Sequence, residues 1–150
     1  MSGNACSGEV SGLAMQNRPP RRILLIDNDA RLIEIMTLCL QNQGYGIVAA
    51  RDGREAMACV QEHANLELIV LELMLPVMDG MRFLRWLRGE RGADLPVLAL
   101  TAADNPGVRD ELETLGVSEV VLKPVRLAAL LERLRRLLEQ AAPDQAATTG

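Results

Sequence analysis

Five short apolar runs alternate with longer segments of helical period along this chain. Each run is too short for an independent helix and is rich in Ile, Val or Leu, which favour strands. The runs cover residues 23–26, 47–50, 68–71, 97–100 and 120–122. The sequence therefore predicts five strands separated by helices.

The segments between these runs carry the helical pattern, and they cover residues 30–43, 54–63, 81–88, 108–115 and 127–140. Gly44 and Gly116 follow two of them, where a helix end favours a residue in the left-handed conformation. Strands that are apolar on both faces and alternate with helices are typical of a parallel sheet covered on both sides. We therefore predict an α/β fold with a five-stranded, parallel, doubly wound sheet.

The composition suits one globular unit, because 49% of the 150 residues are hydrophobic and 24% are charged. The two ends lack any periodic pattern: the first is rich in Ser, Gly, Asn and Pro, and the last contains Pro143 and several alanines. We expect a disordered leader over residues 1–20, a folded domain over 21–140, and a flexible tail or truncated linker over 141–150.

Charge and cysteine content narrow the possible partners. The net charge of -4 gives no basic field that could hold a nucleic-acid backbone. The three cysteines are odd in number and lack metal-ligand spacing, so reduced thiols are expected. No apolar run approaches the ~20 residues of a membrane span. We expect a cytoplasmic protein that binds other proteins, and neither nucleic acid nor membranes.

Polar side chains follow four of the predicted strands. Asp27, Asn28, Glu72, Thr101 and Lys123 lie at or just beyond the strand ends. In a doubly wound sheet, the binding crevice lies at the carboxyl ends of the strands. Carboxylates suit a divalent cation, while a hydroxyl and an ammonium suit phosphate oxygens. The set predicts a site for a cation beside a phosphoryl group.

The sequence around these residues resembles the receiver domains of bacterial two-component response regulators. The resemblance covers the whole predicted domain and rests on four stretches, residues 23–29, 68–80, 96–102 and 116–124. It implies a flavodoxin-like fold in which acids on the first strand and an aspartate on the third hold Mg²⁺. That aspartate would accept a phosphoryl group from a histidine kinase. A Thr and an aromatic residue would then switch together, and the Lys would contact the phosphate.

Three positions depart from the family pattern. Asn28 replaces the second acid of the first pair, Glu72 replaces the phosphoacceptor aspartate, and Val120 replaces the switch aromatic. Loss of one carboxylate weakens Mg²⁺ binding, and the longer Glu72 arm displaces the nucleophile by about 1 Å, which can cost ~100-fold in rate. The resemblance thus implies a degenerate, weak Mg²⁺ site made by Asp27, Asn28, Glu72 and Met74.

These departures predict an atypical receiver domain that is not an enzyme and acts through phosphorylation-independent protein–protein contacts. Its partners would be signalling proteins such as a histidine kinase or a downstream effector. The alternative is a working phosphoacceptor that a histidine kinase phosphorylates with Mg²⁺. Binding of a flavin-like cofactor is a remoter alternative, because Tyr45, Phe83 and Trp86 are the only aromatic residues available for stacking.

Some of the candidate residues have simpler structural alternatives. Asp29 could cap the first helix, and Thr101 could cap the helix after the fourth strand as readily as it could contact phosphate. Lys123 is expected to pair with Glu72 or Asp27, because a buried lysine without a carboxylate partner is costly. The resemblance also implies a cis peptide bond before Pro124.

The last helix carries a leucine stripe on one side and charged residues on the other. The charged residues are Arg126, Glu132, Arg133, Arg135, Arg136 and Glu139. They could pair with Asp110, Glu111 and Glu113 of a second copy, which would give a homodimer through the fourth helix, fifth strand and fifth helix. A solvated face is the alternative, because isolated surface ion pairs contribute little.

Overall fold

The computed structural model describes residues 21–102 and 105–140. A single parallel sheet has the strand order β2-β1-β3-β4-β5. Its strands are β1 (Arg22–Ile26), β2 (Gly46–Ala50), β3 (Leu66–Glu72), β4 (Val97–Thr101) and β5 (Glu119–Leu122). The helices are α1 (Ala30–Asn42), α2 (Gly53–Glu62), α3 (Gly80–Arg88), α4 (Pro106–Thr114) and α5 (Leu127–Gln140). The predicted α/β fold is confirmed.

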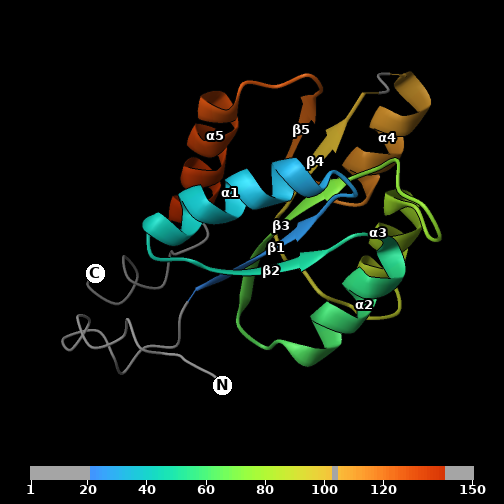
Figure 1. Ribbon diagram of the computed structural model, residues 1–150. Helices are drawn as coiled ribbons and strands as arrows, with labels where there is room; N and C mark the ends of the chain where they lie inside the picture. The colour runs from blue at the N-terminus through green and yellow to red at the C-terminus, as the bar shows by residue number, and fades with distance from the viewer. Residues whose placement is uncertain (1–20, 103–104, 141–150) are drawn as a thin grey trace, which may run out of the picture.

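Helices cover both faces of the sheet, with α1 and α5 on one side and α2, α3 and α4 on the other (Figure 1). Successive residues of a strand point to opposite faces. Leu24 and Ile26 of β1 therefore pack in the α2–α3–α4 core, while Ile23 and Leu25 pack in the α1–α5 core. This explains why successive positions in the middle of β1 are all apolar.

Side chains just before four helices cap their N-termini. Asp29, Asp52, Asp79 and Asn105 each accept hydrogen bonds from backbone N–H groups of the first turn. The predicted capping by Asp29 is confirmed. Thr101 does not cap α4, because that helix begins at Pro106 and Asn105 takes this role.

The sheet topology places the polar strand ends together. The chain passes from β1 to β2 on one side and then to β3 on the other, so the order reverses between β1 and β3. Ile26 lies beside Leu71, Glu72 beside Leu100, and Thr101 beside Leu122 in the register of neighbouring strands. All of these residues lie at the carboxyl edge of the sheet, which is where the candidate residues gather.

The expectations for residues 1–20 and 141–150 lie outside the described residues. Within residues 21–102 and 105–140, no helix has the length and apolar character needed to cross a membrane. Cys39 and Cys59 are free thiols.

Candidate functional site

Lys123 lies between two carboxylates at the carboxyl edge of the sheet. Its Nζ is 3.1 Å from Asp27 Oδ2 and 2.5 Å from Glu72 Oε1. Asp27 and Glu72 are only 3% and 5% exposed. Lys123 therefore pairs with both carboxylates, where the sequence predicted one or the other. We call these three residues the acceptor-site triad.

The pKa of Lys123 reflects two opposing influences. Partial burial disfavours the ammonium, but hydrogen bonds to Glu72 and Asp27, together with their negative charges, outweigh burial and raise the pKa above its usual value of 10.5. Lys123 is therefore protonated at neutral pH and supplies a permanent positive charge to the triad.

Both carboxylate oxygens of Glu72 have partners. Oε1 pairs with Lys123, and Oε2 accepts a hydrogen bond of 3.0 Å from the backbone N–H of Met74. A carboxylate attacks phosphorus through an oxygen lone pair. An oxygen that is held in a buried ion pair is less available for this attack. Glu72 thus lies at the strand end where the resemblance implies the acceptor, and both of its oxygens already have partners within the chain.

Asp27 is held in the same way. Its Oδ2 pairs with Lys123, while its Oδ1 accepts a 2.9 Å hydrogen bond from the backbone N–H of Asp29. Asn28 is exposed to solvent, and Asp29 uses its own carboxylate to cap α1 at Arg31 N and Leu32 N. Of the three polar residues after β1, only Asp27 belongs to the triad.

Thr101 and Val120 occupy the two predicted switch positions. Thr101 is 1% exposed at the end of β4, and its carbonyl oxygen accepts a 2.9 Å hydrogen bond from the backbone N–H of Lys123. Val120 is partly buried on β5 and packs against the α2–α3–α4 core. Position 120 therefore holds a short aliphatic side chain where the resemblance implies an aromatic ring. The Lys123–Pro124 bond is cis, as the resemblance implied.

The donor set at this edge does not fit a tightly held Mg²⁺ ion. Magnesium requires near-octahedral oxygen coordination, usually anchored by carboxylates. Here the triad contains two carboxylates with a lysine ammonium between them, and Asn28 offers only a neutral amide. The Met74 side chain is 64% exposed and contributes no oxygen. No group of three or more His, Cys, Asp or Glu side chains within the described residues could hold a metal ion.

The segment after Glu72 contains a backbone feature that the sequence analysis missed. Val77 has φ 64°, a conformation that a β-branched residue rarely adopts, and Met78 N donates to Pro76 O at 2.6 Å across this turn. Gly53 N fixes the turn from α2 by donating to Met78 O at 2.8 Å. Asp79-Gly80 was the available signal for a turn near Val77, but the β-branched side chain gave no sign of the positive φ.

A shallow pocket of about 410 Å³ lies beside Lys123, between the start of α1 and the segment after β5. Apolar side chains of Leu32, Pro124 and Val125 line it together with Asp29 and Lys123. The approach to the triad from this side is therefore largely apolar.

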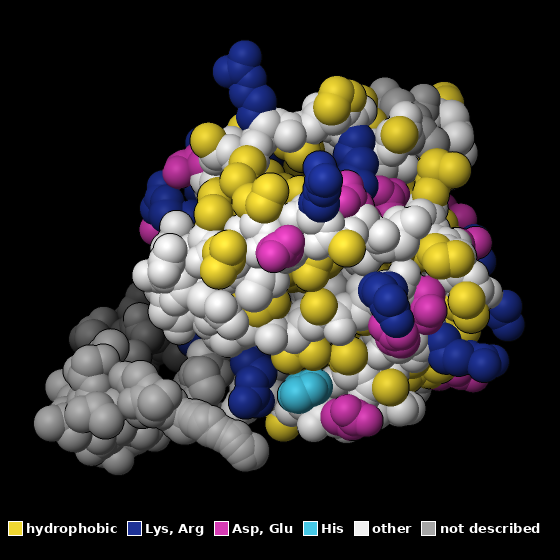
Figure 2. Space-filling model, in the orientation of Figure 1, with side chains coloured by type: hydrophobic (Ala, Val, Ile, Leu, Met, Phe, Trp, Pro, Cys, Tyr) yellow, Lys and Arg dark blue, Asp and Glu magenta, His cyan; other side chains and the backbone are white. Residues whose placement is uncertain are grey.

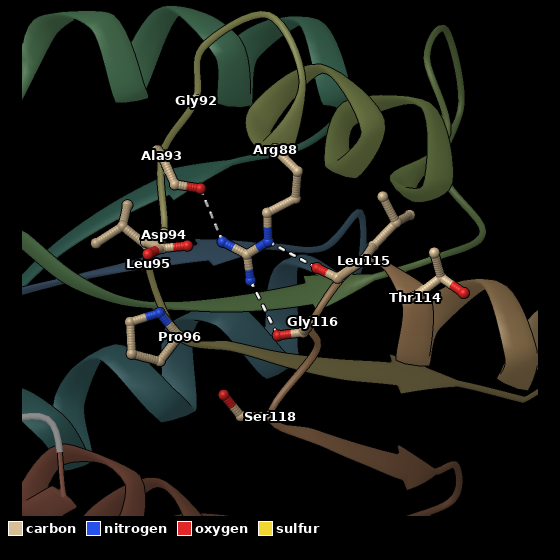
Figure 3. Close-up of a pocket in the computed structure, with 10 residues that line it drawn as sticks. All are labelled: Arg88, Gly92, Ala93, Asp94, Leu95, Pro96, Thr114, Leu115, Gly116 and Ser118. Atoms are coloured by element: carbon tan, nitrogen blue, oxygen red, sulfur yellow. Dashed lines mark hydrogen bonds between the residues drawn. The ribbon is translucent and has the colours of Figure 1, made fainter.

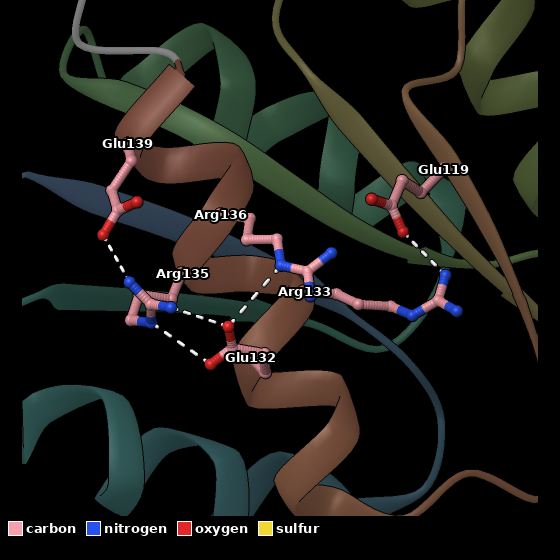
Figure 4. A network of polar contacts seen from close by, with 6 residues as sticks. All are labelled: Glu119, Glu132, Arg133, Arg135, Arg136 and Glu139. Atoms are coloured by element: carbon pink, nitrogen blue, oxygen red, sulfur yellow. Dashed lines mark hydrogen bonds and ion pairs between the residues drawn. The ribbon is translucent and has the colours of Figure 1, made fainter.

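The charged face of α5 is paired within the chain (Figure 4). Arg133 bonds Glu119 of β5 at 2.7 Å, and Arg136 lies 3.5 Å from Glu132. Arg135 binds Glu132 at 2.6 Å and also contacts Glu139. These three arginines already have carboxylate partners, so pairing with a second copy would have to replace them.

Comparisons with known proteins show the family of this chain. Residues 23–135 match the family described as response regulator receiver domain. The response regulator MprA of Mycolicibacterium vanbaalenii is 38% identical over 128 residues, which cover 85% of this chain and 54% of that protein. The MprA of Mycobacterium tuberculosis is 37% identical over 126 residues, covering 84% and 54% respectively. The chain thus spans about half the length of these relatives.

Solved receiver structures share the fold. The non-phosphorylated HemR receiver domain from Leptospira biflexa gives a TM-score of 0.72 at 32% identity, covering 79% of this chain and 94% of that one. The Vibrio cholerae chemotaxis protein CheY4 gives a TM-score of 0.71 at 29% identity, with 79% and 99% covered. The chain therefore belongs to the response regulator receiver domain family, whose members act in two-component signalling.

Proposed function

We propose that this receiver domain acts by binding partner proteins without accepting a phosphoryl group. The observation that carries the proposal is the double engagement of Glu72, whose two oxygens bind Lys123 Nζ at 2.5 Å and Met74 N at 3.0 Å. Using Glu72 as a nucleophile would require breaking a buried ion pair at the group that attacks. The domain is then a binding module and not a catalyst of its own phosphorylation.

The weak fit to Mg²⁺ supports the same proposal. In the family the metal offsets the charge of the incoming phosphoryl group, whereas here the Lys123 ammonium already lies between Asp27 and Glu72 and pairs with both. Val120 further lacks a ring whose rotation could report the state of the site. We therefore expect one dominant conformation.

Two surfaces support partner binding. On the face shown in Figure 2, hydrophobic side chains gather where Figure 1 places α1, and Ile35 and Leu38 of that helix are 46% and 59% exposed. The second surface comprises α4, β5 and α5, through which a homodimer would form. Signalling proteins, including a histidine kinase or a downstream effector, are the partners we expect.

The proposal is tested by intact-mass measurement after incubation with a small phosphodonor and Mg²⁺. The native chain is compared with the Asn28→Asp/Glu72→Asp double variant, which restores both acids of the family pattern. We expect no phosphoryl adduct on the native chain and a hydroxylamine-labile adduct on the variant, because the scaffold retains Lys123 and Thr101.

A labile phosphoryl adduct on native Glu72 would overturn the proposal. That result would identify a working phosphoacceptor for a histidine kinase with an unusual glutamate. Failure of both proteins to react would locate the defect beyond these two residues, and adding Val120→Tyr to the double variant would then test the missing aromatic.

A further inference from the structure

Helix α4 has a small apolar contact with the rest of the domain. Leu112 is its fully buried side chain, and Val108 packs only partly against the α2–α3–α4 core. By comparison, α5 buries Leu130, Leu134, Leu137 and Leu138. Apolar packing alone therefore holds α4 less firmly than α5, and polar contacts contribute more to its position.

Arg88 at the end of α3 bonds the end of α4 (Figure 3). Its Nε donates to Leu115 O at 2.7 Å, and its Nη2 donates to Gly116 O at 3.2 Å. These carbonyls follow the last turn of α4, where backbone acceptors lack partners within the helix. The third bond, from Nη1 to Ala93 O at 3.0 Å, ties the same guanidinium to the segment before β4.

Arg85 makes a second connection one turn earlier. Its Nε and Nη2 bond the two oxygens of Glu111 at 2.5 Å and 3.1 Å. Such a two-point contact fixes orientation as well as distance. Arg85 and Arg88 are three residues apart on α3, while Glu111 and Leu115 are four apart along α4. Three and four residues each correspond to about one helical turn, so the spacing of the two arginines matches the spacing of their two acceptors.

We infer that Arg85 and Arg88 form a clamp that fixes α4 against α3 independently of the acceptor-site triad. Both arginines come from α3 and bind acceptors on α4 or just beyond its end, and neither contacts Asp27, Glu72 or Lys123. The clamp holds the outer surface of α4 in one position, and this position does not depend on whether Glu72 is phosphorylated. Its role in signalling rests on the proposed function, whereas the clamp itself rests on its own contacts.

Hydrogen–deuterium exchange of the full chain tests the clamp. In the Arg85→Ala/Arg88→Ala variant, amides of α4 should exchange roughly tenfold faster, because α4 loses charge-assisted bonds that restrain its opening. Amides of β1 and β3 should keep their native rates. Arg135→Ala, which also removes an arginine with two carboxylate partners but lies on α5, should leave α4 unchanged.

Smaller changes keep the test decisive if the double variant does not fold. Glu111→Gln removes the ionic partner of Arg85 alone, and Arg88→Lys replaces a three-way fork by a single ammonium that cannot reach three carbonyls in the same geometry. Arg88→Lys should speed α4 exchange several-fold, and Glu111→Gln should speed it less, because the Arg85 and Glu111 side chains are 54% and 36% exposed. Native α4 exchange rates in both would overturn the clamp and leave the proposed function standing.

The reverse outcome is distinguishable as well. A phosphoryl adduct on native Glu72 would overturn the proposed function without touching the clamp. If α4 exchange in that phosphorylated chain differed from the untreated chain by tenfold or more, α4 would be coupled to the acceptor site and the clamp inference would also be wrong.

Discussion

Ion pairs occur both at the carboxyl edge of the sheet and on the outer face of α5, but in different surroundings. At the edge, Asp27 and Glu72 are almost fully buried, and a single ammonium pairs with both of them. On α5, Glu132 and Arg135 have side chains that are 45% and 47% exposed. Water screens the α5 pairs. At the edge of the sheet, each buried charge is stabilised by its partner and not by water.

This difference in burial decides what each set contributes. Removing one partner of a buried ion pair leaves a charge in a poorly solvated site and costs about 3–5 kcal/mol. An exposed pair contributes about 0–1 kcal/mol, since water and salt replace the lost partner. The triad therefore determines the state of the acceptor site, while the α5 network mainly determines which charges a partner meets.

Lys123→Met is the change with the largest expected effect. It keeps the length of the side chain but leaves Asp27 and Glu72 without a counter-charge, so the free energy of unfolding should fall by about 3 kcal/mol at pH 7. Urea denaturation measures the loss. A loss below about 1 kcal/mol at pH 7 would show that the triad is solvated.

Raising the pH weakens the same contacts more gently. Because the pKa of Lys123 is higher in the folded chain than its usual 10.5, the folded state holds this proton more tightly than the unfolded state. The contribution of Lys123 to stability is complete below pH 10.5 and is lost as the pH rises through the folded-state pKa. The free energy of unfolding should thus fall more steeply with pH in the native chain than in Lys123→Met.

Val77→Gly tests backbone strain near the carboxyl edge of the sheet without changing any charge there. Val77 has φ 64° and is 75% exposed, so glycine removes the strain and sacrifices little packing. The free energy of unfolding should rise by about 1 kcal/mol in urea denaturation. The control is Val77→Ala, which keeps a Cβ in the left-handed conformation and should give a smaller gain or none; equal gains would point to the side chain and not to φ.

Arg135→Gln tests the exposed side of the comparison. The change removes the ion pairs to Glu132 and Glu139, and we expect only a small loss of stability at low salt, because these side chains are exposed. Thermal unfolding at low and high NaCl concentration measures it, and the difference from the native chain should vanish in high salt. A loss that persists in high salt would mean that Arg135 acts through packing.

Much of the fold could be predicted from local pattern. Every strand and helix appears within two residues of its predicted bounds, and Gly44 and Gly116 take φ values of 96° and 72°. The spacing of the apolar runs and the helical period between them suffice to predict these bounds. A parallel sheet with both faces covered allows few other arrangements of strands and helices. The site was also predictable as a set, since strand ends converge at one edge.

The details of the site were less predictable. Lys123 was expected to pair with one carboxylate and binds two, while Thr101 could have capped α4 and does not. The α3–α4 contacts of Arg85 and Arg88 had no sequence signal, because residues separated by 26 to 28 positions meet only through the packing of two helices. The strain at Val77 depends on a turn that α2 helps to fix.

The sequence by itself determined the order of strands and helices, and it placed a glutamate at position 72 and a valine at position 120. These are properties of residue type and spacing. Only the tertiary structure decided that Glu72 is buried with both oxygens engaged, that Lys123 bridges two carboxylates, and that α4 is bonded to α3. Those features depend on distances between side chains from different elements, which are fixed only when the two cores pack against the sheet.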